Sequence, residues 1–293
     1  MKGDQLSQTA AFIAIKFYGL TQNPRFRSLF EPSTLEFYDR LVRQLPKPLN
    51  YYHFWLQHEW VRKLYTWSEE LLLPGDLLHV VGRKWMIQRL VRKLVDDGYE
   101  QLIVLGAGFD HLGYHYAQKG MPCFEFDAPH MATLKTEFLN RCYPGKKHPS
   151  IDSILLPGDR LARRFERNGD LDSDKKTIVV AEGFFDYLDT GTVSSALEQL
   201  HNYFGHGTAL VSTHFALDEL SPFHRWIFQT SVKMVGEELR FDSSISEFKG
   251  LLSKKGFHMK ECCDSGDLGR KLKTHLTTDL PMLKGIYLVL AES

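Results

Sequence analysis

Acidic residues and glycines recur along the chain at the points where short apolar segments end. There are four such points: Gly106 and Gly108 after residues 101–105, Asp127 after 122–126, Asp159 after 151–156, and Glu182 after 175–181. Short apolar segments rich in branched side chains are typical of buried parallel strands. The carboxyl ends of parallel strands meet at one edge of a sheet, where ligands bind in such folds. We therefore expect the four points to converge on one ligand site.

The chemistry of these residues restricts the ligand. A glycine turn between a strand and a helix exposes backbone N–H groups. The fingerprint of dinucleotide-binding folds needs a third glycine, and His111 stands at that position. Three carboxylates would also repel a pyrophosphate, whereas they suit a ligand with hydroxyl, amino and positively charged groups. A dinucleotide-dependent oxidoreductase is therefore only an alternative.

Asp127 occupies the position with the most specific expected role. It follows the glycines by about twenty residues, the spacing at which an acid accepts hydrogen bonds from the two hydroxyls of a ribose. The alternative is that Asp127 caps the next helix, because the segment DAPHMATLK is a good helix start.

The elements that must position these side chains alternate between strand and helix. Three more strands are expected, at residues 208–213, 257–263 and 286–291. Seven strands alternating with helices predict an α/β fold with a doubly wound, Rossmann-like sheet.

Residues 1–80 have a different pattern. They carry apolar residues at helical spacing, many aromatic side chains and several prolines, without a strand signal. We expect a helical N-terminal cap at 1–80 and a ligand-binding domain at 81–293, whose first helix covers residues 81–97 and has mostly solvated charges.

Composition excludes several kinds of partner. The 36 Lys and Arg balance the 36 Asp and Glu, so there is no electrostatic reason to expect nucleic acid or an anionic membrane. No apolar stretch approaches the ~18–20 residues of a membrane span, and the N-terminus lacks a signal-peptide pattern. The four cysteines have no metal-ligand spacing. We expect a cytoplasmic protein with reduced thiols and no metal.

Five motifs carry a resemblance to a known family. In chain order they are LGAGFD, FEFDAPHMATLK, LLPGD, VVAEGFFDYL and GEELRFDSSISEFKGLLSKKGFHM. From about residue 80 to the C-terminus the chain resembles the leucine carboxyl methyltransferase-like family of S-adenosylmethionine-dependent O-methyltransferases. This group includes bacterial members described as polyketide O-methyltransferases.

The resemblance implies a set of contacts with S-adenosylmethionine. Gly106 and Gly108 would approach the methionine part, Asp127 the ribose hydroxyls, Asp159 with the following Arg160 the adenine amino group, and Glu182 the α-amino group. Arg83 falls near the arginine that in this family pairs with the carboxylate of the cofactor. A solvated charge on the helix is the alternative for Arg83.

The sequence departs from the family pattern beside the expected reaction centre. His111 and Leu112 replace a Thr-Arg pair, and Asp186 precedes Tyr187 where an apolar residue is commoner. These changes leave the acceptor open, and they permit a catalytically silent S-adenosylmethionine-binding protein.

The acceptor decides whether a general base is needed. A carboxylate is already ionised and needs none, whereas a hydroxyl acceptor does, and histidine is the usual choice. The candidates are His111, His115 and above all His214, with Tyr187 as a hydrogen-bonding partner. The sequence predicts an O-methyltransferase that acts on a carboxylate, or a hydroxyl, of a small molecule or a peptide C-terminus.

Overall fold

The structure, a computed structural model, describes residues 7–234 and 236–293 and contains one seven-stranded sheet within them. The strands are β1 (Gln101–Leu105), β2 (Cys123–Asp127), β3 (Ser150–Ser153), β4 (Thr177–Ala181), β5 (Thr208–Phe215), β6 (His258–Cys263) and β7 (Ile286–Glu292). Their order in the sheet is β3-β2-β1-β4-β5-β7-β6. The first five strands are parallel, and β7 runs antiparallel to β5 and β6. This order confirms the doubly wound α/β sheet.

Helices cover both faces of the sheet and form a separate group at one end. They are α1 (Gln8–Thr21), α2 (Pro24–Arg27), α3 (Pro32–Gln44), α4 (Tyr51–Trp55), α5 (Glu59–Leu72), α6 (Asp76–Asp96), α7 (Leu112–Gln118), α8 (Pro129–Cys142), α9 (Leu161–Arg167), α10 (Thr190–Phe204), α11 (Pro222–Met234), α12 (Ile245–Lys254) and α13 (Ser265–Lys273). Short 3₁₀ turns are η1 (Phe185–Tyr187), η2 (Gly205–Gly207) and η3 (Leu217–Glu219). In the described ranges no helix has the length and apolar character needed to cross a bilayer.

The core is divided by the sheet into two layers because strand side chains alternate between faces. On β1, Leu102 and Val104 pack with the cluster formed by α1, α3, α6, α7, α8 and α13. Ile103 and Leu105 point the other way, into the cluster formed with α9, α10 and α12. The middle strands are therefore buried on both sides, as their continuous apolar sequence predicts.

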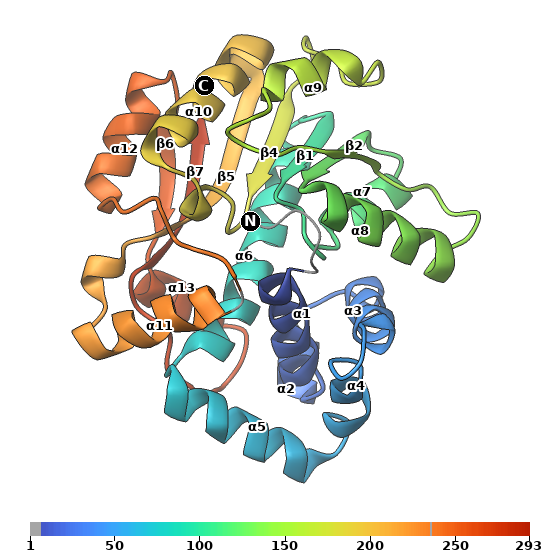
Figure 1. The fold of residues 1–293 in the computed structure, drawn as a ribbon, viewed down its shortest axis with the longest axis vertical. Helices are drawn as coiled ribbons and strands as arrows, with labels where there is room; N and C mark the ends of the chain where they lie inside the picture. The colour runs from blue at the N-terminus through green and yellow to red at the C-terminus, as the bar shows by residue number, and fades with distance from the viewer. Residues whose placement is uncertain (1–6, 235) are drawn as a thin grey trace.

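The N-terminal helices share their core with the rest of the molecule. Figure 1 shows α1–α5 (blue) gathered below the sheet, with α6 running from this group up to it. Phe17 and Tyr38 of this group belong to the same buried cluster as Leu90 of α6 and Leu102 of the sheet. The helix α6 begins at Asp76, five residues before the expected start at 81, so it crosses the expected boundary at residue 80.

The ends of two strands differ from expectation for a reason visible in the pairing. The edge strand β3 pairs only with β2 and ends at Ser153, so residues 154–157 form a loop instead of continuing the strand. In contrast, β5 continues to Phe215, because it pairs along its length with β7 as far as Ile286.

Gly113 of α7 is required by a buried ion pair beneath the helix. Glu125 of β2 and Lys135 of α8 lie 2.6 Å apart and are fully buried. A Cβ atom at position 113 would lie 2.1 Å from Oε1 of Glu125. We expect Gly113→Ala to displace this carboxylate and to lower the free energy of unfolding by about 3–5 kcal/mol, as disruption of a buried pair does.

Gly250→Ala in α12 is the matched control, since a Cβ there meets no atom of the described part of the chain within 4 Å. An alanine in an open helical position should raise the free energy of unfolding by about 0.5–1 kcal/mol. Urea unfolding of both variants measures the difference. Equal effects of the two substitutions would show that the pair tolerates displacement.

Candidate active site

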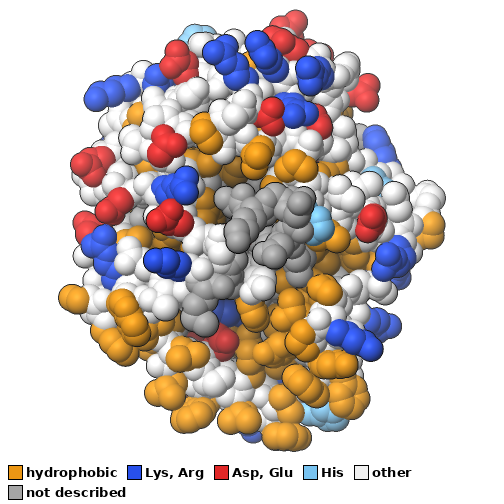
Figure 2. All heavy atoms as spheres, viewed as in Figure 1, with side chains coloured by type: hydrophobic (Ala, Val, Ile, Leu, Met, Phe, Trp, Pro, Cys, Tyr) orange, Lys and Arg blue, Asp and Glu red, His pale blue; other side chains and the backbone are white. Residues whose placement is uncertain are grey.

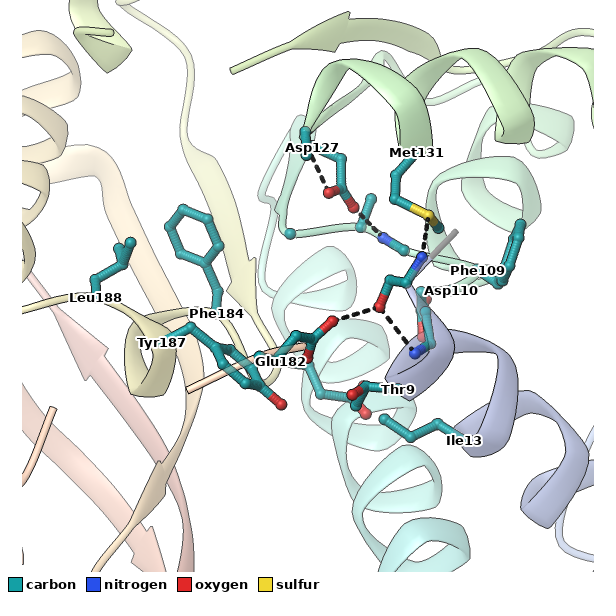
Figure 3. A pocket seen from close by; sticks show the side chains of 18 of the residues that line it. Thr9, Ile13, Phe109, Asp110, Asp127, Met131, Glu182, Phe184, Tyr187 and Leu188 are labelled. Carbon is teal, nitrogen blue, oxygen red and sulfur yellow. Dashed lines mark hydrogen bonds between the residues drawn. The ribbon is translucent and has the colours of Figure 1, made fainter. Parts of the chain in front are cut away.

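A cavity of about 490 Å³ opens at the carboxyl ends of β1, β2 and β4. Its volume lies within the ~300–1,000 Å³ of ordinary small-molecule sites. The walls come from the loops after these strands, from the loop 154–157, from α1, and from the segment 236–240. Figure 3 shows Asp127 and Glu182 on the walls of this one cavity, with Tyr187 beside Glu182.

The glycine turn after β1 presents bare backbone to the cavity. Gly106 and Gly108 both have positive φ angles, 62° and 46°, which other residues rarely adopt. A Cβ at Gly106 would lie 2.7 Å from Cδ2 of Phe184, and one at Gly108 would lie 3.3 Å from the Cβ of Ala10. Both positions therefore require glycine for conformation as well as for space.

Asp127 ends β2 directly beside this turn. Its carboxylate accepts hydrogen bonds from the N–H of Gly108 and, at 2.6 Å, from the N–H of Ala128. Burial raises the pKa of Asp127, although these two backbone N–H groups oppose the shift. The N-cap residue of α8 is Ala128, and Asp127 makes no capping bond to the first turn of the helix, so the helix-cap alternative is wrong; the side chain of Asp127 lines the cavity.

Four charged side chains from distant segments form a buried cluster on the opposite wall. The Nε of Arg83 lies 2.7 Å from Oε1 of Glu182, and the Nζ of Lys84 lies 2.7 Å from Oδ2 of Asp110. Lys84 also reaches Oε2 of Glu182 at 3.4 Å. The positive charges of the two cations balance the negative charges of the two carboxylates. Each ion pair joins α6 to a residue that follows a strand.

Burial and pairing act against each other in this cluster. Burial disfavours the charged form of Lys84, but the carboxylates of Asp110 and Glu182 outweigh it and hold the pKa of the ammonium above its usual range. Burial likewise disfavours the charged form of Asp110, and Lys84 outweighs it, so the pKa of that carboxyl lies well below its usual range. Lys84 and Asp110 therefore both stay charged at neutral pH.

The first turn of α1 closes one side of the cavity. Thr9, Ala10 and Ile13 line it. Before them, the hydroxyl of Ser7 donates to Oε1 of Glu237 at 2.8 Å, and its backbone N–H lies 3.3 Å from the Sδ of Met131. Ser7 thus joins α8 and the segment after α11 across the cavity.

The structure brings together most of the site residues expected from the sequence. Those that line the cavity are Arg83, Gly106, Gly108, Asp127, Glu182 and Tyr187. Burial, with the carboxylates of Glu237 and Asp186 nearby, raises the pKa of Tyr187 well above its usual range. Tyr187 is therefore a neutral hydrogen-bonding group at the cavity wall.

Asp159 and Arg160 do not line the cavity. The carboxylate of Asp159 accepts a hydrogen bond from the N–H of Leu155 at 2.9 Å and pairs with Arg164 at 3.0 Å. Arg160 is the residue before the first turn of α9. The carboxylate closes its own loop, and it is the backbone and side chains of residues 154–157 that reach the cavity.

The three histidines also lie away from the cavity wall. His214 is inside the sheet on β5, where its Nε2 is 2.8 Å from the carbonyl oxygen of Ser243 and its ring stacks on Phe248. His111 is buried against Gln88, and burial lowers its pKa to about 3. His115 lies 3.7 Å from Glu31 near the protein surface.

Sequence reasoning missed Lys84, Asp110, Ser7 and Glu237. Most charges of residues 81–97 were expected to be solvated, with Arg83 as the candidate exception; this holds for Arg89, Arg92 and Lys93, but Lys84 is buried as well as Arg83. The sequence does contain a sign that Lys84 is buried: this residue lies between Val81 and Trp85, in the more apolar half of the helix.

Asp186, next to the cavity-lining Tyr187, makes the stability of the fold depend on pH. Its Oδ1 accepts the N–H of Phe215 at 2.9 Å, its Oδ2 is buried without a partner among residues 7–234 and 236–293, and burial raises its pKa to about 7. Between its unfolded pKa of about 3.9 and this value the folded protein binds more protons, so stability falls as pH rises. Between pH 5 and pH 8 the titration of this one group should lower the free energy of unfolding of the wild type by about 2–3 kcal/mol.

Asp186→Asn keeps an acceptor for Phe215 and removes the titration. Urea unfolding should show that the free energy of unfolding falls less from pH 5 to pH 8 in the variant than in the wild type. The same loss in both proteins would mean that the Asp186 carboxyl is ionised throughout this range.

Known structures with a similar fold superpose on this chain. A DUF574 family protein from Streptomyces avermitilis MA-4680 superposes with a TM-score of 0.58 at 11% identity, covering 80% of this chain and 90% of that one. A candidate methyltransferase from Thermobifida fusca YX gives a TM-score of 0.56 at 15% identity, covering 80% and 89%. At these identities the likeness establishes the fold. No curated protein matches the sequence significantly.

The fold and the family comparison define an S-adenosylmethionine-dependent methyltransferase. The family model of leucine carboxyl methyltransferase matches residues 36–201, more than half of the chain. The chain belongs to the leucine carboxyl methyltransferase family, and S-adenosylmethionine is its cofactor. This assignment confirms the resemblance found in the motifs and replaces the dinucleotide alternative.

Proposed function

We propose that this protein is an O-methyltransferase whose acceptor is a carboxylate of a small molecule or a peptide C-terminus. The observation that carries the proposal is the convergence of Asp127, Glu182 and the glycine turn on one cavity. The name of its family, leucine carboxyl methyltransferase, supports a carboxylate as acceptor.

The residues of the cavity fit the cofactor chemically. Asp127 would accept hydrogen bonds from ribose hydroxyls, Glu182 would pair with the α-ammonium group, and Arg83 would pair with the carboxylate. The glycine turn lines the cavity without side chains, so the cofactor can approach its backbone closely. The apolar loop 154–157 would pack on the adenine.

S-adenosylmethionine, when bound, would supply a methyl group on a positively charged sulfur: the bond from the acceptor oxygen to the methyl carbon would form as the carbon–sulfur bond breaks, leaving a neutral thioether. The contribution of the protein is to orient the acceptor and exclude water, which can supply roughly 7–11 kcal/mol of the barrier. Ile13 and Tyr187 line the cavity for this purpose, and α1 closes it. Lys233 and Arg240, also on its wall, are cations that could hold an acceptor carboxylate.

A carboxylate acceptor suits the composition of the cavity wall. It is ionised at neutral pH and needs no general base. Within residues 7–234 and 236–293, no histidine lines the cavity. A hydroxyl acceptor is the second candidate, because Glu237 lies on the wall and could accept a proton.

Methyl transfer from tritiated S-adenosylmethionine tests the proposal against a panel of carboxylic acids with matched alcohols and phenols. A methyl ester releases volatile methanol in mild base, whereas a methyl ether does not. Base-labile product from an acid supports the carboxylate acceptor. Base-stable product from a hydroxyl compound would replace it with the second candidate. Calorimetric binding of the cofactor without any product would favour a silent binding protein.

A further inference from the structure

The helix α5 presents its apolar side chains outward, which is unusual for a surface helix. Trp60, Leu64, Trp67 and Leu71 are 71%, 55%, 63% and 67% exposed. We call these four residues the α5 seam. In the space-filling view, hydrophobic side chains gather along the lower edge of the molecule, where the ribbon places α5 (Figure 2).

Two polar residues of α5, Arg62 and Glu69, face the protein instead. Glu69 pairs with Lys16 of α1 at 2.9 Å, and Arg62 donates to the backbone oxygens of Leu56 and Gln57 at 3.0 and 2.7 Å. These contacts fix the rotation of the helix. The seam is therefore held outward by specific interactions, and a partner that covers it would not need to turn the helix.

The spacing of the seam indicates another helix as its partner. Its residues follow one another by four, three and four positions, which is the alternation of a coiled-coil interface. In an antiparallel pairing of two copies, Trp60 would lie opposite Leu71 of the second copy, and Leu64 opposite Trp67. Each large side chain would then meet a smaller one, whereas a parallel pairing would place Trp against Trp.

The area around the seam matches what a dimer needs. Tyr51, Phe54 and Trp55 of the neighbouring α4 are also 43–62% exposed. At ~150–250 Å² per aromatic side chain, the exposed aromatic surface of α4 and α5 amounts to roughly 600 Å². The leucines of α5 bring the total close to the ~800 Å² that each partner buries in a standard interface.

We propose that the α5 seam is the two-fold interface of a homodimer, with the two α5 helices packed antiparallel. A two-fold axis makes the same surface self-complementary. A lipid surface is the other occupant to consider, but the chain has no net charge, and Lys63 beside the seam is paired with Glu59 at 2.8 Å. The seam therefore lacks the cationic border that attracts anionic lipid.

The oligomeric state of the full chain tests the proposal by sedimentation at about 50 µM. The wild type should be a dimer, and Leu64→Glu should raise its dissociation constant by at least roughly 30-fold, as loss of an interface hot spot does. Trp226→Glu in α11 is the control, because this side chain is equally exposed, at 62%, outside the seam. It should leave the dimer intact.

A wild-type monomer, or a dimer that survives Leu64→Glu, would overturn the proposal. So would a monomer that floats with phosphatidylcholine vesicles through the seam. Cysteine cross-linking tests the direction of packing, in a background with exposed Cys262 replaced by serine. Trp60→Cys should cross-link to Leu71→Cys in a mixture but not to itself, and the reverse result would contradict the antiparallel arrangement.

Discussion

Replacing Asp127 with asparagine is expected to weaken the binding of S-adenosylhomocysteine by roughly 10–150-fold, measured by calorimetry. The factor corresponds to ~1.5–3 kcal/mol for a hydrogen bond to a charged group. Asp127 ends β2 at the cavity and lies against the glycine turn. An asparagine keeps one acceptor oxygen for the backbone but loses the charge and the second acceptor that two ribose hydroxyls need.

Asp159→Asn is the matched control for this prediction. Asp159 also follows a strand of the same sheet, but its carboxylate bonds to Leu155 and Arg164 outside the cavity wall. We expect the dissociation constant of S-adenosylhomocysteine from the Asp159→Asn variant to stay within about threefold of the wild-type value. This change is well below the effect of losing a charged contact. Equal losses in both variants, or a larger loss for Asp159→Asn, would contradict the assignment of the ribose to Asp127.

Lys84→Met is expected to lower the free energy of unfolding by about 3–5 kcal/mol, because it leaves buried carboxylates without their cation. Lys84 is 5% exposed and lies 2.7 Å from Asp110 and 3.4 Å from Glu182. Lys260→Met is the control, since the pair of Lys260 with Glu292 is 3.8 Å long and about half exposed. Its removal should cost about 1 kcal/mol or less in urea unfolding.

The pH dependence of this deficit distinguishes charge from packing. Lys84 holds the pKa of Asp110 below its unfolded value of about 3.9. Stability from this depressed pKa is fully present above pH 3.9 and is lost as the pH falls through the folded value. The difference in free energy of unfolding between the wild type and Lys84→Met should therefore be constant from pH 6 to 8 and become smaller in acid. A gap that does not change in acid would point to packing alone.

The part of the site that could be predicted from the sequence is the part attached to buried strand ends. Gly106 and Glu182 follow, and Asp127 ends, strands whose short, mostly apolar sequences indicate where they end. Because parallel strands share one carboxyl edge, their last residues converge without further information.

The remaining site residues depend on tertiary contacts that no local pattern contains. Asp159 follows the edge strand β3, where only one neighbour fixes the strand end, and its carboxylate closes the loop instead of facing the ligand. His214 follows the expected end of β5, but pairing with β7 continues the strand and keeps the ring inside the sheet. Lys84 becomes a buried cation only because α6 crosses the cavity beside Asp110 and Glu182.

The most direct test of the central claim is a crystal structure of the protein with S-adenosylhomocysteine. The account predicts ribose hydroxyls within hydrogen-bonding distance of the Asp127 carboxylate, with the amino and carboxylate groups of the ligand next to Glu182 and Arg83. A ligand bound in that cavity with its ribose away from Asp127, or bound elsewhere on the molecule, would contradict it.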